Sequence, residues 1–238
     1  MACYALIPAA GAGTRFRGDT PKQYLPLAGR PMLWHAVNAV CTAPIENVFV
    51  ILAPEDRQFA SFDWSAFAGR LEPLYCGGQA RRDSVYNGMV AAMAAVDADD
   101  WVLVHDAARP CLPKQDLANL IREAQDDRIG AILALPVADT VKRAVKEETR
   151  TEEGLPLRIA GTVDRSRLWL AQTPQMFRYG LLMEALRKAK HWVTDEASAV
   201  EQMGLRPRLV AGSRENIKVT FLEDLGIAEA ILAGRNRS

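Results

Sequence analysis

Residues 8–15 have the sequence Pro8-Ala9-Ala10-Gly11-Ala12-Gly13-Thr14-Arg15, with two glycines set among alanines near the start of the chain. This stretch directly follows residues 4–7, an apolar run whose brevity favours a buried strand over a helix. Gly11 and Gly13 reach backbone angles that are closed to other residues, and the alanines beside them leave the amide hydrogens open to an anion. The stretch therefore predicts a phosphate-binding loop at the carboxyl end of the first strand.

Two basic residues flank this glycine loop. Arg15 is the last residue of the stretch, and Lys22 follows in a segment whose prolines prevent a regular helix. A dinucleotide-binding fingerprint is the alternative, but Phe16 stands where its third glycine is required. The Walker pattern also fails, because no Gly-Lys-Ser/Thr follows at the right spacing. The two cations favour phosphate binding over a loop that merely turns tightly.

Strand and helix patterns alternate along most of the chain. Short apolar runs predict further strands at 47–52, 71–75, 101–104, 130–137, 168–171, 209–210 and 217–219. Apolar residues at helical spacing predict helices after Pro31 and at 84–93, 117–124, 181–189, 195–203 and 222–232. This alternation indicates an α/β fold with a doubly wound, mostly parallel sheet and helices on both faces, in a single domain over residues 1–238.

Residues 139–159 interrupt the alternation. Two strand-like runs there flank a polar stretch, residues 146–154, which has no core of its own. The pattern predicts an extended β-hairpin arm. Because an isolated two-stranded hairpin is marginal in water, we expect the arm to rest against a partner subunit.

Composition limits the classes of function and the location. The formal net charge of the 238 residues is zero, so no bulk basic field favours nucleic acid, and an anion site must gather its cations locally. Cys3, Cys41, Cys76 and Cys111 show no paired or metal-ligand spacing, which suits reduced, space-filling thiols. No secretion signal and no run of roughly 20 apolar residues is evident. We therefore expect a cytoplasmic protein without nucleic-acid or membrane partners.

Four motifs in this order are typical of one enzyme family. They are the loop at 8–15, Gly77-Gly78-Gln79-Ala80-Arg81-Arg82-Asp83-Ser84-Val85, His105-Asp106-Ala107-Ala108-Arg109-Pro110 and Asn216-Ile217-Lys218-Val219-Thr220. With them the sequence resembles, over nearly its whole length, the 2-C-methyl-D-erythritol 4-phosphate cytidylyltransferases. The resemblance implies a Rossmann-like nucleotidyltransferase fold and a homodimer formed through the arm.

The candidate residues suit nucleotidyl transfer. Attack on the α-phosphate of a nucleoside triphosphate builds negative charge on the phosphoryl oxygens, so catalysis needs placed cations, backbone donors and a metal. Arg15, Lys22 and Lys218 are the candidate cations, and the amides of residues 10–13 are the candidate donors. Asp106 follows a predicted strand, where a carboxylate can hold Mg²⁺ beside phosphate oxygens. A lysine among apolar residues, as at 218, indicates an anion that receives it.

Each of these residues has a plainer interpretation. Asp106 can cap the turn that follows its strand, and Ser84 can be only a helix N-cap. For Arg15 and Lys22, each taken in isolation, solvated surface charge is the favoured interpretation, and their place beside the glycine loop reverses that preference. His105 is interpreted as a packed residue at a strand end rather than a base or a metal ligand.

The resemblance also implies roles for single residues. It places Arg15 and Lys22 at the α-phosphate, and Arg165 and Lys218 at the attacking alcohol phosphate, as the catalytic set. Arg109, Thr140 and Arg165 are expected to come from the partner subunit. The nucleotide pocket it implies is made by Pro8, Ala9, Ala10, Gly11, Gly13, Gly78, Gln79, Ser84, Asp106 and Ala107, with the alcohol phosphate held by Arg109, Thr140, Thr173 and Thr194.

The implied reaction is transfer of CMP from CTP to 2-C-methyl-D-erythritol 4-phosphate, with Mg²⁺ as cofactor at Asp106. The alternative within the superfamily is a cytidylyltransferase for a pentitol phosphate such as ribitol 5-phosphate. The alternative from another class is a nucleotide-binding module without catalysis, which would not need Arg15, Lys22 and Asp106 together. One departure from the family pattern is Gln79, where an acidic residue often stands, and it leaves one ribose or base contact open.

Overall fold

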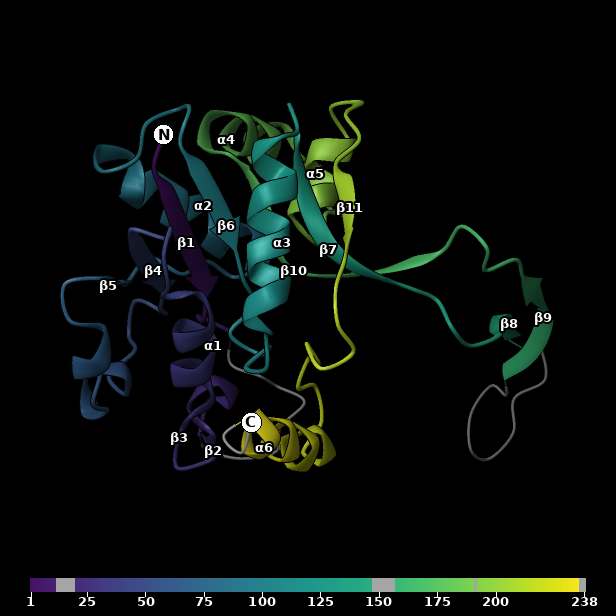
Figure 1. The fold of residues 1–238 in the computed structure, drawn as a ribbon. Helices are drawn as coiled ribbons and strands as arrows, with labels where there is room; N and C mark the ends of the chain where they lie inside the picture. The colour runs from purple at the N-terminus through teal and green to yellow at the C-terminus, as the bar shows by residue number, and fades with distance from the viewer. Residues whose placement is uncertain (12–19, 147–156, 191, 236–238) are drawn as a thin grey trace.

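The computed structural model describes residues 1–11, 20–146, 157–190 and 192–235, and its centre is a seven-stranded sheet (Figure 1). The strand order is β11-β7-β10-β6-β1-β4-β5. Its pairings are parallel, except that β10 runs antiparallel to both of its neighbours. The strands are β1 (Cys3–Pro8), β4 (Asn47–Ile51), β5 (Leu71–Leu74), β6 (Trp101–Val104), β7 (Gly130–Pro136), β10 (Trp169–Arg178) and β11 (Arg208–Ala211). The predicted fold class is confirmed.

Helices cover both faces of this sheet because its strands are apolar on both sides. In β1, Ala5 and Ile7 belong to one buried cluster with α1 (Met32–Val40) and α3 (Lys114–Gln125). Leu6, between them, belongs to the opposite cluster. That cluster includes α2 (Arg81–Ala91), α4 (Tyr179–Lys188) and α5 (Glu196–Glu201). The last helix, α6 (Glu223–Arg235), packs beside a small two-stranded ribbon of β2 (Pro26–Leu27) and β3 (Arg30–Pro31).

The strand order creates a switch point beside β1. From β1 the chain passes through α1 to β4 on one side, whereas β6 pairs on the other side. Leu6 is opposite Val104, the last residue of β6, and β1 continues to Pro8, so the loops that follow the two parallel strands leave the same edge of the sheet. Ligands of doubly wound sheets bind at such a point, outside the carboxyl ends of the strands.

Two predicted segments have a different structure. Residues 217–219 are not a strand, because the edge of β7 is already taken by β11, and they form a loop in which the Val219 N–H donates to the Ala108 carbonyl at 2.8 Å. The segment after the glycine loop is not wholly irregular, since Lys22–Tyr24 forms one turn of 3-10 helix. The strand predicted at 168–171 is longer and continues through Pro174 to Arg178 with a shift of register.

The predicted hairpin arm is present. β8 (Val141–Lys146) pairs antiparallel with β9 (Leu157–Val163), and Figure 1 shows the pair far from the central sheet. The second strand runs beyond the predicted end at 159, because Val141 pairs with Val163. Leu157 and Ile159 are about two-thirds exposed, at 67% and 69%, although both are apolar. In the described ranges, no helix combines the length and the apolar character needed to cross a membrane.

Candidate active site

A pocket of about 230 Å³ lies at the switch point of the sheet. The loops after β1 and β6 form two of its walls, and the start of α2 forms a third. Lys22 and Lys218 bring positive charge to it from two other segments. The predicted residues that line the pocket are Pro8, Ala9, Ala10, Gly11, Lys22, Gly78, Gln79, Ser84, Asp106, Ala107 and Lys218. Gly13 and Arg15 lie outside the described residues.

The second glycine motif shapes one wall by close backbone packing. A Cβ on Gly77 would lie 2.2 Å from the Cβ of Ala10, and one on Gly78 would lie 2.5 Å from the Cβ of Asp83. The Gly78 N–H donates to the hydroxyl of Ser84 at 3.1 Å. Ser84 is the fourth residue of α2, so the alternative that it is the N-cap is wrong. Its hydroxyl instead holds the glycine turn against the helix.

We expect Gly78→Ala to distort the pocket. The new Cβ would lie 2.5 Å from the Cβ of Asp83, and neither atom can move away without a shift of its backbone. Overpacking of this kind costs about 1–3 kcal/mol of folding free energy, and the displaced turn should weaken CTP binding by at least about tenfold. Urea unfolding and calorimetric titration with CTP measure the two effects. Gly226→Ala on α6 is the control, because its Cβ meets nothing within 4 Å. Unchanged CTP affinity in Gly78→Ala would contradict this account of the wall.

Asp106 is the buried carboxylate of the pocket, with a side chain only 9% exposed. Its Oδ1 accepts from the Nε of Arg81 at 2.8 Å, and its Oδ2 lies 2.7 Å from the Nζ of Lys218. Burial alone would raise the pKa of Asp106, but the charges of Arg81 and Lys218 outweigh burial, and its pKa lies well below the ordinary value. Asp106 is therefore an anion at neutral pH, and it is the anion that receives Lys218.

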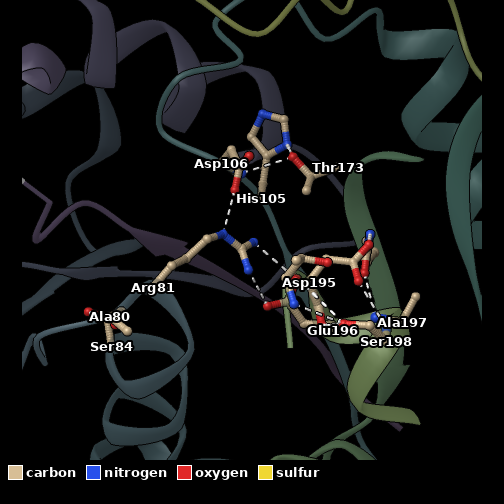
Figure 2. A network of polar contacts seen from close by, with 12 residues as sticks. Ala80, Arg81, Ser84, His105, Asp106, Thr173, Asp195, Glu196, Ala197 and Ser198 are labelled. Atoms are coloured by element: carbon tan, nitrogen blue, oxygen red, sulfur yellow. Dashed lines mark hydrogen bonds and ion pairs between the residues drawn. The ribbon is translucent and has the colours of Figure 1, made fainter. Parts of the chain in front are cut away.

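Arg81 joins Asp106 to a second buried carboxylate (Figure 2). Its two terminal nitrogens donate to Oε1 and Oε2 of Glu196 at 2.6 and 3.0 Å. Glu196 begins α5, where the side chain of Asp195 accepts from the Ser198 N–H as the N-cap. Burial opposes the charged form of Arg81, but the two carboxylates raise its pKa above the ordinary value.

Arg81 and Glu196 were not among the residues predicted to form the site. One signal was available for Arg81, because it is the first residue of α2, where the helix dipole disfavours a cation. An arginine there indicates a carboxylate nearby. The sequence did not identify Glu196 as that carboxylate, since Glu196 is 115 residues further along the chain.

Thr173 and His105 form a buried hydrogen-bonded chain with the backbone of Asp106. The hydroxyl of Thr173 accepts the Asp106 N–H at 2.9 Å and is 3.2 Å from Nδ1 of His105. The Nε2 of His105 is 3.0 Å from the Arg109 carbonyl, which can only accept, so Nε2 carries the proton. Burial lowers the pKa of His105 to about 4, and the ring is neutral. The interpretation of His105 as a packed strand-end residue is confirmed.

The residues expected at the alcohol phosphate are spread over three regions. Arg109 is buried in the body of its own chain, where its guanidinium donates to the Asn216 carbonyl at 2.6 Å. It lines a second cavity of about 400 Å³, to which Lys218 also contributes. Thr140 and Arg165 are exposed on the two segments that join the arm to the sheet, and Thr194 is exposed just before α5.

Asp106 is the candidate protein ligand for a divalent cation. No cluster of three His, Cys, Asp or Glu side chains able to hold a metal occurs in the part of the chain that the structure describes. Mg²⁺ is usually held by one or two carboxylates together with substrate phosphates and water. A single buried, ionised carboxylate in a pocket with two lysines fits that pattern, provided that phosphate oxygens supply further ligands.

Comparisons with known proteins give consistent results. The family model described as 2-C-methyl-D-erythritol 4-phosphate cytidylyltransferase matches residues 3–234. A relative of that name from Dechloromonas aromatica is 52% identical over 98% of both chains. One from Laribacter hongkongensis is 53% identical and covers 97% of this chain and 96% of its own.

Solved structures agree with these sequence relatives. A 4-diphosphocytidyl-2C-methyl-D-erythritol synthase superposes with a TM-score of 0.81 at 39% identity, covering 97% of this chain and 98% of that one. The 2-C-methyl-D-erythritol 4-phosphate cytidylyltransferase of Thermus thermophilus superposes with a TM-score of 0.74 at 30% identity, covering 98% of this chain and all of its own.

Proposed function

The chain belongs to the 2-C-methyl-D-erythritol 4-phosphate cytidylyltransferase family and transfers CMP from CTP to 2-C-methyl-D-erythritol 4-phosphate; we propose that the pocket at the ends of β1 and β6 holds the CTP. The products are 4-diphosphocytidyl-2-C-methyl-D-erythritol and pyrophosphate, in isoprenoid precursor biosynthesis. The observation that carries the placement is the meeting of a glycine loop, Lys22, Lys218 and Asp106 in one pocket at the switch point.

The nucleotide and the reacting phosphate need different surroundings. The pocket wall at Gly78 is close-packed backbone, where a Cβ would lie 2.5 Å from the Cβ of Asp83, and we assign the cytosine base to this wall. Ala10 and Gly11, which follow β1, line the pocket together with Lys22, and we assign the phosphates to that side. We assign Lys22, together with Arg15, to the charge that develops on the α-phosphate as the alcohol phosphate attacks.

Mg²⁺ is part of the proposal, with Asp106 as its protein ligand. When bound, the ion neutralises phosphate oxygens and so favours departure of pyrophosphate. Lys218 is 48% exposed along its side chain and reaches Asp106 from a loop, so its ammonium can turn to a phosphate oxygen once CTP is present. Arg81 is held by its ion pair with Glu196, so it remains beside the Asp106 carboxylate.

The acceptor is proposed to enter from the side of the second cavity. Arg109, which was expected to come from the partner subunit, lines this cavity together with Lys218 of its own chain, and both supply positive charge there. Thr173 acts through Asp106, since its hydroxyl accepts the Asp106 N–H. Thr140 and Arg165 lie on the arm segments, which supports a homodimer in which the partner's arm completes the site. A cytoplasmic location is also proposed, because the four cysteines are free thiols of the kind a reducing compartment maintains.

A pyrophosphate-release assay tests the function. The enzyme should release pyrophosphate from CTP with 2-C-methyl-D-erythritol 4-phosphate, the acceptor that the names of the relatives print, and we expect ribitol 5-phosphate to be a poor acceptor. Equal turnover of the two acceptors would contradict the specificity, and no turnover with either would contradict the reaction.

Lys22→Ala and Arg15→Ala are each expected to lower turnover by about 10²- to 10³-fold, by analogy with removal of one oxyanion donor. Lys22 lines the pocket from a short turn, so its loss should leave the fold intact. Steady-state kinetics and circular dichroism measure both points. Lys114→Ala, at the start of α3 and away from the pocket, is the control for loss of one ammonium. A loss below tenfold would remove the residue concerned from the transition-state role.

A further inference from the structure

Ion pairs join four side chains around Asp106. Arg81 and Lys218 are cations, and Asp106 and Glu196 are anions, so the charges of these four side chains sum to zero. Figure 2 shows the guanidinium of Arg81 lying between the two carboxylates. The side chain of Glu196 is only 1% exposed, and both of its oxygens are used by Arg81.

The two cations of this group differ in how firmly they are held. Arg81 makes a bidentate pair with Glu196, a geometry that fixes the plane of the guanidinium. Its remaining Nε–H is thereby directed to one oxygen of Asp106. Lys218 has an exposed side chain and approaches the other oxygen as a point charge on a flexible stem. Arg81 is the permanent neighbour of Asp106, and Lys218 is the one able to leave.

Without Glu196, Arg81 would be an unfavourable neighbour for Asp106 as a metal ligand. An unpaired guanidinium would neutralise Asp106 and would be free to rotate into a bidentate pair with both of its oxygens. With Glu196 in place, departure of Lys218 toward phosphate leaves two carboxylates and one guanidinium, a net charge of minus one. A divalent cation is attracted to that arrangement and not to a neutral pair.

We propose that Glu196 is a positioning residue that compensates the charge of Arg81 and so keeps the Asp106 carboxylate available to a divalent cation bound with CTP. The inference rests on the proposed placement of Mg²⁺ at Asp106. It gives the first residue of α5 a role in the nucleotide site, although Glu196 does not line the pocket.

The test is the effect of Mg²⁺ on CTP affinity, measured by calorimetric titration in the absence of the acceptor. The quantity compared is the ratio of the Kd for CTP in EDTA to the Kd in millimolar Mg²⁺. Glu196→Gln should lower this ratio by about tenfold, as expected for one uncompensated charge near a divalent ion. In EDTA alone the variant should bind CTP as tightly as wild type or more tightly, because its site is more positive. A merely structural loss would weaken binding in both media, which would overturn the proposal.

A second variant covers the case in which Glu196→Gln folds poorly. The double variant Arg81→Gln/Glu196→Gln removes one charge of each sign and should recover most of the Mg²⁺ effect. A double variant as insensitive to Mg²⁺ as the single one would overturn charge compensation. Glu201→Gln, at the exposed end of the same helix, is the matched control and should keep the wild-type ratio.

Asp106→Asn separates this inference from the proposed function. If Asp106→Asn loses the Mg²⁺ effect while Glu196→Gln keeps it, the metal site stands and the role of Glu196 is overturned. If Asp106→Asn keeps the wild-type ratio, the metal is not at Asp106, and both the placement and the inference fail. Mn²⁺ binding to the CTP complex, followed by electron paramagnetic resonance, reads the same difference without turnover.

Discussion

Asp106→Asn is expected to reduce Mg²⁺-dependent turnover to the limit of detection. The amide keeps the shape of the side chain but removes the charge that a hard divalent cation requires. It also leaves Arg81 and Lys218 without the carboxylate that both now contact, so the approach to the triphosphate changes as well. Kinetics over a wide range of Mg²⁺ concentration, with CTP saturating, measure the loss.

The loss must be separated from unfolding, because truncating one partner of a buried ion pair is destabilising by about 3–5 kcal/mol. Near-ultraviolet circular dichroism and thermal unfolding of Asp106→Asn show whether the fold persists at the assay temperature. Asp126→Asn, exposed at the end of α3, is the control for loss of one carboxylate. Activity of Asp106→Asn at ordinary Mg²⁺ levels would mean that the triphosphate alone holds the metal.

The fold was predictable where local pattern and tertiary position agree. The strands at the centre of the sheet are short apolar runs, as in Trp101–Val104, and strands buried on both faces have that pattern. Residues 217–219 have the same pattern but are not a strand. Their apolar side chains pack in the small cluster with Leu27 and Met32 instead, and the edge of β7 is occupied by β11. A short apolar run predicts burial, but it does not predict which partner buries it.

The site was predictable where one segment carries its own chemistry. The glycine loops and the strand-end carboxylate stand out, because glycine and a charged residue at the end of an apolar strand have few other uses. Glu196 did not stand out, because an acidic residue in the first turn of a helix already has a local explanation in the helix dipole. Its pairing with Arg81 depends on α4, which packs against both α2 and α5 and so sets their relative position, and that is a property of the whole fold.

The arm is the part of the structure whose purpose is least explained within one chain. The register of the hairpin pairs Val141 with Val163, so Thr140 and Arg165 flank the same end of it. Neither residue lines the pocket or the second cavity of its own chain. Apolar side chains of the hairpin, Val145 among them, are more than half exposed. Exchange of arms across a two-fold axis would cover those side chains and bring both polar residues to a neighbouring site.

Two inactive variants are therefore expected to complement each other. Lys22→Ala removes a residue of the body, and Arg165→Ala removes one of the arm, so each homodimer has one lesion in both of its sites. After the two chains are unfolded and refolded together, half of the dimers are mixed. A mixed dimer has one site with both lesions and one with neither, so the activity should recover to roughly a quarter of wild type.

The fraction of mixed dimers in the refolded sample must be known before the recovered activity can be interpreted. Native mass spectrometry counts the mixed dimers, and activity expressed per mixed dimer should be about half that of a wild-type dimer, which corresponds to roughly a quarter per total protein when half of the dimers are mixed. A mixture of Lys22→Ala with Arg15→Ala is the control, because both residues belong to the body and no pairing of those chains produces an intact site. If mixed dimers of Lys22→Ala and Arg165→Ala form without recovery, both residues serve the same chain, because exchange of arms across the two-fold axis would have produced one intact site in every such dimer.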